Sequence, residues 1–81
     1  MRLNKEERYQ LKLISLAKEI SRSSGYRPVY EYNPHFETMT HAFTVFTDSC
    51  NDFVIWNSGF DTAQECYNWV LDKCRKEGLV R

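Results

Sequence analysis

The sequence predicts an α+β fold in which two helices pack on one face of a three-stranded antiparallel sheet, in the order α-β-β-β-α. Apolar residues recur at helical spacing near both ends of the 81-residue chain. Alternating, strand-like segments lie between them, and clusters of turn-forming residues separate the segments. Both helices most simply cover the same face of such a sheet, which leaves the other face to water or to a partner.

The first helix is predicted from about residue 5 to residue 22. Asn4 can cap its first turn, and Glu7 three residues later completes a capping box. The residues spaced by three and four that predict its buried face are Tyr9, Leu13, Leu16, Ala17 and Ile20. Ser23, Ser24 and Gly25 end the helix.

Three strands are predicted at residues 28–32 (PVYEY), 41–47 (HAFTVFT) and 53–57 (FVIWN). Pro28 excludes a helix at the start of the first strand. The residues DSCND join the last two strands as a hairpin, and residues 33–39 (NPHFETM) are expected to form a mobile or functional loop. Alternation provisionally separates Val29, Phe43, Val45, Phe53 and Ile55 from Tyr30, Tyr32, Phe46, Val54 and Trp56.

The last helix is predicted to begin with Asp61 as its N-cap and Gln64 three residues later. The residues expected on its buried face are Ala63, Cys66, Tyr67, Val70, Leu71 and Cys74. Its last turn carries Lys73, Arg75 and Lys76 before Gly78, and these cations complement the helix dipole.

Length and composition indicate one folded, soluble domain over residues 1–81. Aromatic residues make up 15% of the chain, which favours a sufficient core at this size. No apolar run has the roughly 18 residues that a membrane span needs, and the first ten residues lack the apolar core of a signal peptide, so we expect a cytoplasmic protein. The odd cysteine count favours reduced thiols over disulfides or zinc, with Cys66 and Cys74 in the core and Cys50 exposed.

Charge is distributed unevenly along a chain whose net charge is zero. Residues 1–27 carry a net charge of +4, residues 28–65 carry −6 and contain no Lys or Arg, and residues 66–81 carry +2. The acids of the middle segment are Glu31, Glu37, Asp48, Asp52, Asp61 and Glu65. They can serve only as solvated surface groups, or they can form an acidic surface that repels phosphates and suits a basic groove of a partner protein.

The element order, together with PVYEY and HAFTVFT as the first two strands, resembles the double-stranded RNA-binding domain over roughly residues 8–76. That resemblance implies RNA contacts from the first helix, from a loop with a histidine and from a lysine-rich motif at the start of the last helix. The matching positions here are Lys5, Arg8, Lys12, His35 and His41. The third region departs from the family. Its sequence is DTAQE, from Asp61 to Glu65, where the family has lysines.

These observations favour a small non-enzymatic binding protein, an inhibitor or adaptor that docks on a basic site of a partner protein. The predicted contact residues are the six acids Glu31, Glu37, Asp48, Asp52, Asp61 and Glu65 and the aromatic residues Tyr32, Phe46 and Trp56. The aromatic residues can equally be buried under the helices or in a homodimer. As a complete chain of this size and charge, the protein is similar in style to small phage-encoded inhibitors, including anti-CRISPR proteins.

Duplex RNA binding is the alternative function. Neither hypothesis requires a cofactor or a metal, because His35 and His41 lack two further ligands at a suitable spacing. An enzyme is the least favoured class. Cys50 and His41 can be imagined as nucleophile and base, but no third residue is identified to orient them.

Overall fold

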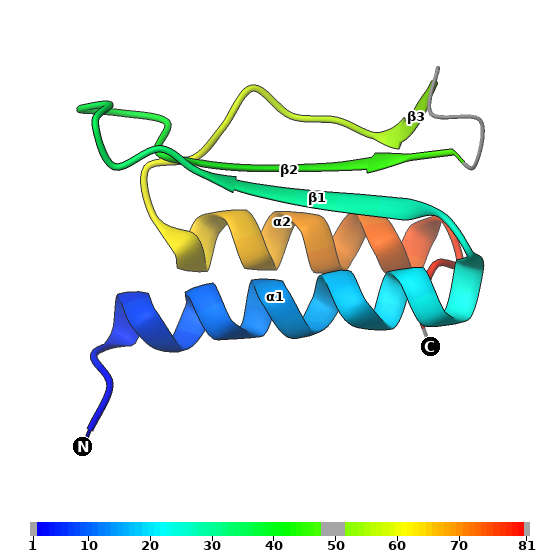
Figure 1. Cartoon of the computed structure of the whole chain (residues 1–81), viewed down its shortest axis with the longest axis horizontal. Helices are drawn as coiled ribbons and strands as arrows, with labels where there is room; N and C mark the ends of the chain where they lie inside the picture. The colour runs from blue at the N-terminus through cyan, green and yellow to red at the C-terminus, as the bar shows by residue number, and fades with distance from the viewer. Residues whose placement is uncertain (1, 48–51, 81) are drawn as a thin grey trace.

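The computed structural model describes residues 2–47 and 52–80. Its elements are α1 (Lys5–Ser24), β1 (Arg27–Tyr32), β2 (His41–Phe46), β3 (Phe53–Ile55) and α2 (Ala63–Lys76). The strands form one antiparallel sheet in the order β1-β2-β3, and both helices pack side by side against the same face (Figure 1). The predicted α+β fold is therefore confirmed. Within the described ranges, no helix is long and apolar enough to cross a membrane.

Helix α1 begins with the predicted capping box. The Asn4 side chain accepts a hydrogen bond from the Glu7 backbone at 2.8 Å, and the Glu7 carboxylate accepts one from the Asn4 backbone at 3.2 Å. The helix continues two residues beyond its predicted end, because Ser23 and Ser24 remain helical and each donates its hydroxyl to the carbonyl four residues earlier. Gly25 then ends the helix with φ 76°, a left-handed conformation that favours glycine.

The predicted N-cap of α2 is wrong. Thr62, not Asp61, caps the helix, and its hydroxyl accepts a hydrogen bond from the Glu65 backbone at 3.2 Å. The Asp61 carboxylate instead accepts from the backbone N–H of Met39 at 2.8 Å. The side chain that the sequence pattern predicts as the N-cap of the helix therefore forms a tertiary contact with the loop instead.

The strand register corrects the provisional division of the apolar residues. Tyr30 lies opposite Phe43 and Tyr32 opposite His41, so both tyrosines share the helix-covered face with the buried side of β2. Val29 lies opposite Thr44 on the outer face. An irregularity in the β2–β3 pairing between Val45 and Phe46 places Phe53 opposite Phe46 and shifts the phase of β3. Neither the register nor this irregularity can be predicted from alternation alone.

One hydrophobic core lies between the sheet and the helices. Its buried members are Leu13, Leu16, Ile20, Phe43, Val45, Ile55, Ala63, Cys66, Val70, Cys74 and Leu79. The predicted burial of Cys66 and Cys74 is confirmed, whereas Tyr67 and Leu71 are only partly buried. Cys50, Asp48 and most of the predicted hairpin turn lie outside the described residues.

Candidate binding groove

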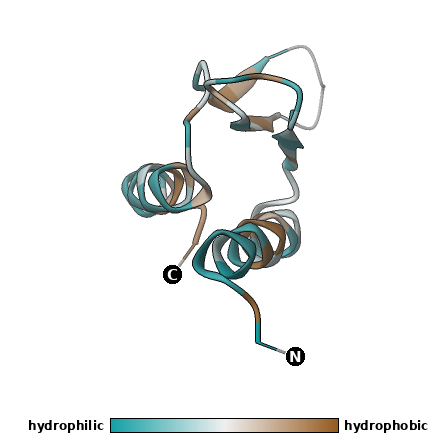
Figure 2. Cartoon of the chain, turned by 90° about the vertical axis from the view of Figure 1, so that its left-hand side faces the viewer, coloured by the Kyte–Doolittle hydropathy of each residue, from teal (hydrophilic) through white to brown (hydrophobic). Residues whose placement is uncertain are grey.

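The outer face of the sheet carries no helix. Figure 2 shows both helices on one side of the sheet and none on the other. Register and alternation place Arg27, Val29 and Glu31 of β1 on this outer face. Ala42, Thr44 and Phe46 of β2 lie opposite them on the same face.

A groove runs over this face. The residues that line it are Glu31, Ala42, Thr44, Phe46, Phe53, Trp56, Asn57 and Ser58. Ala42 and Thr44 are small and leave space over the middle of β2, whereas Phe53 and Trp56 are 52% and 57% exposed. Among the described residues, the lining includes one carboxylate and neither lysine nor arginine.

Asn57 fixes the chain that forms the wall of the groove. Its side-chain amide donates to the Phe43 carbonyl at 2.6 Å and accepts from the Phe43 N–H at 3.4 Å. These bonds replace backbone pairing after β3 ends at Ile55, two residues before the predicted end of the strand. Trp56 is consequently held beside β2 while its side chain stays exposed.

Aromatic rings and one cation surround the end of the groove near Phe46. The rings of Phe53 and Trp56 are 6.4 Å apart and tilted by 37°. The guanidinium of Arg27 lies 5.1 Å from the centre of the Phe46 ring. This end of the face is therefore apolar, with a cation at its rim.

The structure brings only some of the predicted partner-binding residues together. Glu31, Phe46 and Trp56 line the groove. Tyr32, Glu37, Asp61 and Glu65 lie where β1 ends and α2 begins, and Asp52 lies beside the start of β3, at the opposite end of the sheet. The acids therefore do not form a single surface. None of the five described carboxylates forms an ion pair with lysine or arginine within the described ranges.

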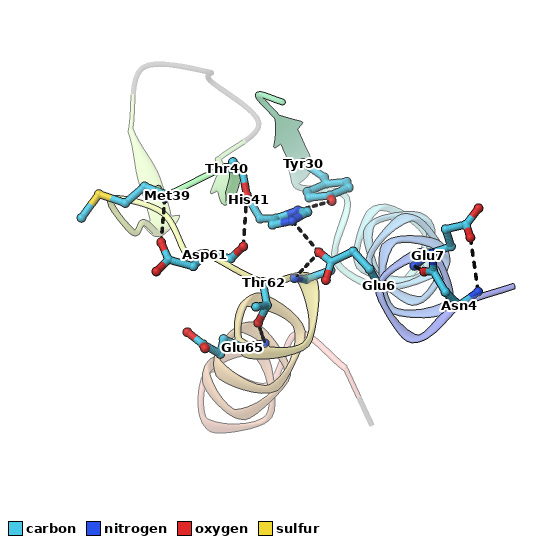
Figure 3. A network of polar contacts seen from close by, with 11 residues as sticks. Asn4, Glu6, Glu7, Tyr30, Met39, Thr40, His41, Asp61, Thr62 and Glu65 are labelled. Carbon is cyan, nitrogen blue, oxygen red and sulfur yellow. Dashed lines mark hydrogen bonds and ion pairs between the residues drawn. The ribbon is translucent and has the colours of Figure 1, made fainter. Parts of the chain in front are cut away.

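Asp61 anchors the loop between β1 and β2. Besides the bond to Met39, its backbone carbonyl accepts from the Thr40 hydroxyl at 3.2 Å (Figure 3). Met39 has φ 55°, which is uncommon for a residue with a side chain. Gly59 packs so closely that an added Cβ would lie 3.0 Å from the Met39 Cβ. Asp61 thus has a structural role, and the anchored loop leaves Phe36 and Met39 exposed.

A second polar cluster, which sequence reasoning missed, lies beneath the sheet (Figure 3). His41 Nε2 is 2.7 Å from the Glu6 carboxylate, and His41 Nδ1 is 2.7 Å from the Tyr30 hydroxyl. Glu6 also accepts from the backbone N–H of Ala63 at 2.8 Å. A neutral imidazole satisfies both contacts, because Nε2–H donates to Glu6 while Nδ1 accepts from Tyr30.

This network holds elements together. Its members come from α1, β1, β2 and the start of α2. His41 is 2% exposed, whereas the Glu6 side chain is 41% exposed at the edge of the network. Burial raises the pKa of the Tyr30 hydroxyl, and Cys66 and Glu6 add to the rise, so Tyr30 remains a donor. Glu6 and His41 are far apart in sequence, and no local pattern signals their contact.

Only some of the residues predicted to contact RNA lie together. Lys5, Arg8 and Lys12 are exposed on α1 at helical spacing, and His35 is exposed in the loop between β1 and β2. The Lys12 ammonium also lies over the rings of Tyr9 and Tyr67, at 4.6 Å and 5.6 Å from their centres. His41 is the first residue of β2, as predicted, but it is buried and does not face solvent with the loop. A direct contact between His41 and RNA would require this part of the fold to open.

No protein family, curated protein or solved structure matches the chain. The resemblance to the double-stranded RNA-binding domain consequently rests on element order and strand patterns. Among the described residues, no group of three or more His, Cys, Asp or Glu side chains is placed to hold a metal ion.

Proposed function

We propose that this protein is a small non-enzymatic binding protein, an inhibitor or adaptor, whose outer sheet face docks on a basic site of a partner protein. One observation carries the proposal. The groove combines two aromatic side chains that are more than half exposed with an unpaired carboxylate, and neither lysine nor arginine lines it.

The exposed aromatic side chains are the first source of binding energy. Phe53 and Trp56 keep about half of their surfaces in water, although the hydrophobic core lies directly on the other face of the sheet. Covering such rings in an interface removes apolar surface from water, and tryptophan is enriched among the residues that dominate binding energies. Docking on this face would therefore supply the affinity.

Charge would supply the preference for a basic partner. Glu31 lies on the outer face, opposite Ala42 of β2, and its side chain is exposed. An unpaired carboxylate at the edge of an apolar groove favours a cation on the opposing surface, and the more distant Glu37 and Glu65 can assist the approach through long-range attraction.

Site-specific photo-crosslinking tests the proposal. A photoreactive phenylalanine analogue is placed at Phe53 in the groove, and in a matched control at Ile14, which is exposed on α1. Each protein is irradiated in an extract of the source cells. We expect a discrete adduct from position 53 alone, which excess wild-type protein prevents and the Glu31→Lys, Trp56→Ala double variant does not. The same adducts from both positions, or equal competition by the double variant, would contradict the proposal.

The alternative function, binding of duplex RNA, predicts a different result. Lys5 and Arg8 on α1 would provide the main phosphate contacts, together with His35 of the loop. A gel-shift titration with duplex RNA at two salt concentrations separates the two functions, because phosphate binding weakens steeply with salt. Salt-sensitive binding that is lost in a Lys5→Ala, Arg8→Ala variant would support RNA binding and oppose the proposed function.

Sedimentation of the protein alone tests whether a second copy of the chain covers the outer face.

A further inference from the structure

We propose that the groove binds the guanidinium group of a partner arginine between the Phe53–Trp56 ring pair and Glu31. The inference rests on the proposed function and specifies the chemical group that the partner presents. The supporting observations are the distribution of cations over the aromatic rings, the placement of Glu31 and the position of Arg27.

Several partly buried aromatic rings of this protein carry a cation from the chain itself, whereas the exposed rings of Tyr32, Phe36, Phe53 and Trp56 do not within the described residues. Lys12 lies over the Tyr9 and Tyr67 rings. Lys73 lies over Trp69, with its ammonium 5.5 Å from the ring centre, and Arg27 lies over Phe46. Such contacts stabilise the cation because the face of an aromatic ring carries negative potential.

The Phe53–Trp56 pair differs from these groups. Both rings are more than half exposed, and among the described residues no lysine or arginine lies over either of them. The two ring centres are 6.4 Å apart with their planes inclined by 37°, and both residues line the groove, whereas Tyr32 and Phe36 do not. The groove is therefore a site where a cation from another molecule would find two exposed rings.

Glu31 is placed to complete such a site. It pairs with Ala42 on one side of β2, and Trp56 follows Ile55, which pairs with Val45 on the other side. Two strand spacings, about 10 Å, separate β1 from β3. Along the strands Glu31 lies nearer to Trp56 than to Phe53, because the β2 partner of Glu31 is Ala42 and that of Phe53 is Phe46. A side chain that enters over Ala42 and Thr44 would contact ring faces on one flank and a carboxylate on the other. The small floor residues leave space for its stem.

Guanidinium fits this arrangement better than ammonium. A guanidinium is planar, stacks on aromatic rings and donates two parallel hydrogen bonds to a carboxylate, whereas an ammonium acts as a point charge. The chain itself provides an example on the same face, because Arg27 lies 5.1 Å from the Phe46 ring centre. The groove would accordingly take an arginine from a basic segment of the partner.

Nuclear magnetic resonance of the two tryptophan indoles tests the inference. Trp56 lines the groove, whereas Trp69 lines only a neighbouring hollow, which it shares with Trp56 and Lys73, so the Trp69 indole N–H reports whether binding extends beyond the groove. The protein is titrated with an arginine-containing peptide and with the same peptide in which citrulline replaces arginine. Citrulline keeps the shape of arginine and removes its charge.

We expect saturable shifts of the Trp56 indole with the arginine peptide, and much smaller shifts with the citrulline peptide or at Trp69. Phe53→Leu and Glu31→Gln should each weaken binding by about three- to ten-fold, because each removes one interaction with the cation. Glu37→Gln, in the loop between β1 and β2, is the matched control and should weaken binding by less than about two-fold, because Glu37 can act only through long-range attraction.

Equal binding of the two peptides, or no effect of Phe53→Leu and Glu31→Gln, would overturn the inference. A Trp56 indole that does not respond to the arginine peptide would overturn it as well. These results are distinguishable from failure of the proposed function, because a specific crosslink at position 53 would still show that a protein docks on the groove.

Discussion

The side chain of His41 links residues that lie far apart in the sequence. It contacts Glu6 near the start of the chain and Tyr30 on the neighbouring strand, and the same Glu6 carboxylate holds the first N–H of α2. Because His41 is 2% exposed, water cannot replace a lost partner easily. The contribution of this residue to stability therefore depends on satisfaction of buried polar groups.

Replacement of His41 by phenylalanine should destabilise the fold by about 1–3 kcal/mol, because the Tyr30 hydroxyl loses its acceptor and Glu6 loses one donor. The free energy of unfolding is measured by urea denaturation at pH 7. His35→Phe is the matched control, because His35 is exposed in the loop, and it should change stability by less than about 0.5 kcal/mol. Similar effects of the two substitutions would contradict the structural role of the network.

Gly59→Ala should destabilise the protein by more than Gly25→Ala. Both glycines have positive φ, 130° and 76°, so alanine is strained at either position. Only at Gly59 would the new Cβ also contact Met39, at 3.0 Å, whereas nothing lies within 4 Å of a Cβ at Gly25. Thermal unfolding of the two variants provides the comparison. Equal melting temperatures would show that the loop around Met39 accommodates the new Cβ without loss of stability.

Among the elements, α2 shows how a tertiary contact changes a local signal. Asp61 and Thr62 are both good N-cap residues, and sequence reasoning chose the first. The loop between β1 and β2 binds the Asp61 carboxylate through Met39, so the helix begins one residue later, with Thr62 as its cap. One side chain thus anchors the loop, and its neighbour starts the helix.

Thr62→Ala should lower stability by about 1 kcal/mol, because the N–H of Glu65 loses its acceptor in the first turn of α2. Circular dichroism during urea unfolding measures the change. Thr38→Ala is a suitable control, because Thr38 is exposed in the loop, and it should have little effect. A larger loss in the control would contradict the assignment of the cap.

For the whole molecule, burial of ionisable groups in the core links stability to pH. Burial raises the pKa of Cys66 to about 12, and burial with a smaller contribution from Glu19 raises the pKa of Cys74 to about 11. The folded protein therefore keeps two thiol protons at pH values where the unfolded chain loses them. Above pH 9 the unfolded state binds fewer protons, so stability falls as pH rises.

Urea unfolding under reducing conditions should show a midpoint that is flat well below the usual thiol pKa of 9 and falls from about pH 9 to about pH 10.5. Burial also raises the pKa of Tyr30, which adds to the decline at higher pH. The Cys66→Ala, Cys74→Ala variant should be less stable at pH 8 but show a shallower decline. An unchanged slope in this variant would indicate that other groups cause it.

Because the carboxylates of the middle segment lie apart, reversing their charges should affect the affinity of the proposed complex to different degrees. Glu31 lines the groove, whereas Glu65 lies in the first turn of α2 and does not line it. Once the partner is in hand, Glu31→Lys should weaken binding by at least about ten-fold through a direct repulsive contact, and Glu65→Lys by about two-fold through long-range repulsion. Calorimetric titrations at two salt concentrations measure both. Equal effects that vanish together in high salt would indicate general attraction without a defined site.

The sequence alone determined the order of the elements, the capping box of α1 and the burial of Cys66 and Cys74, because each depends on residues close in sequence or on a repeating pattern. Tertiary structure alone decided the strand register, the choice between Asp61 and Thr62, the burial of His41 and the placement of Glu31 beside Trp56. Each of these depends on contacts between distant segments, whose geometry no local pattern specifies. The five described acids of the middle segment show the difference most clearly, because they are close in the sequence and lie at opposite ends of the sheet in space.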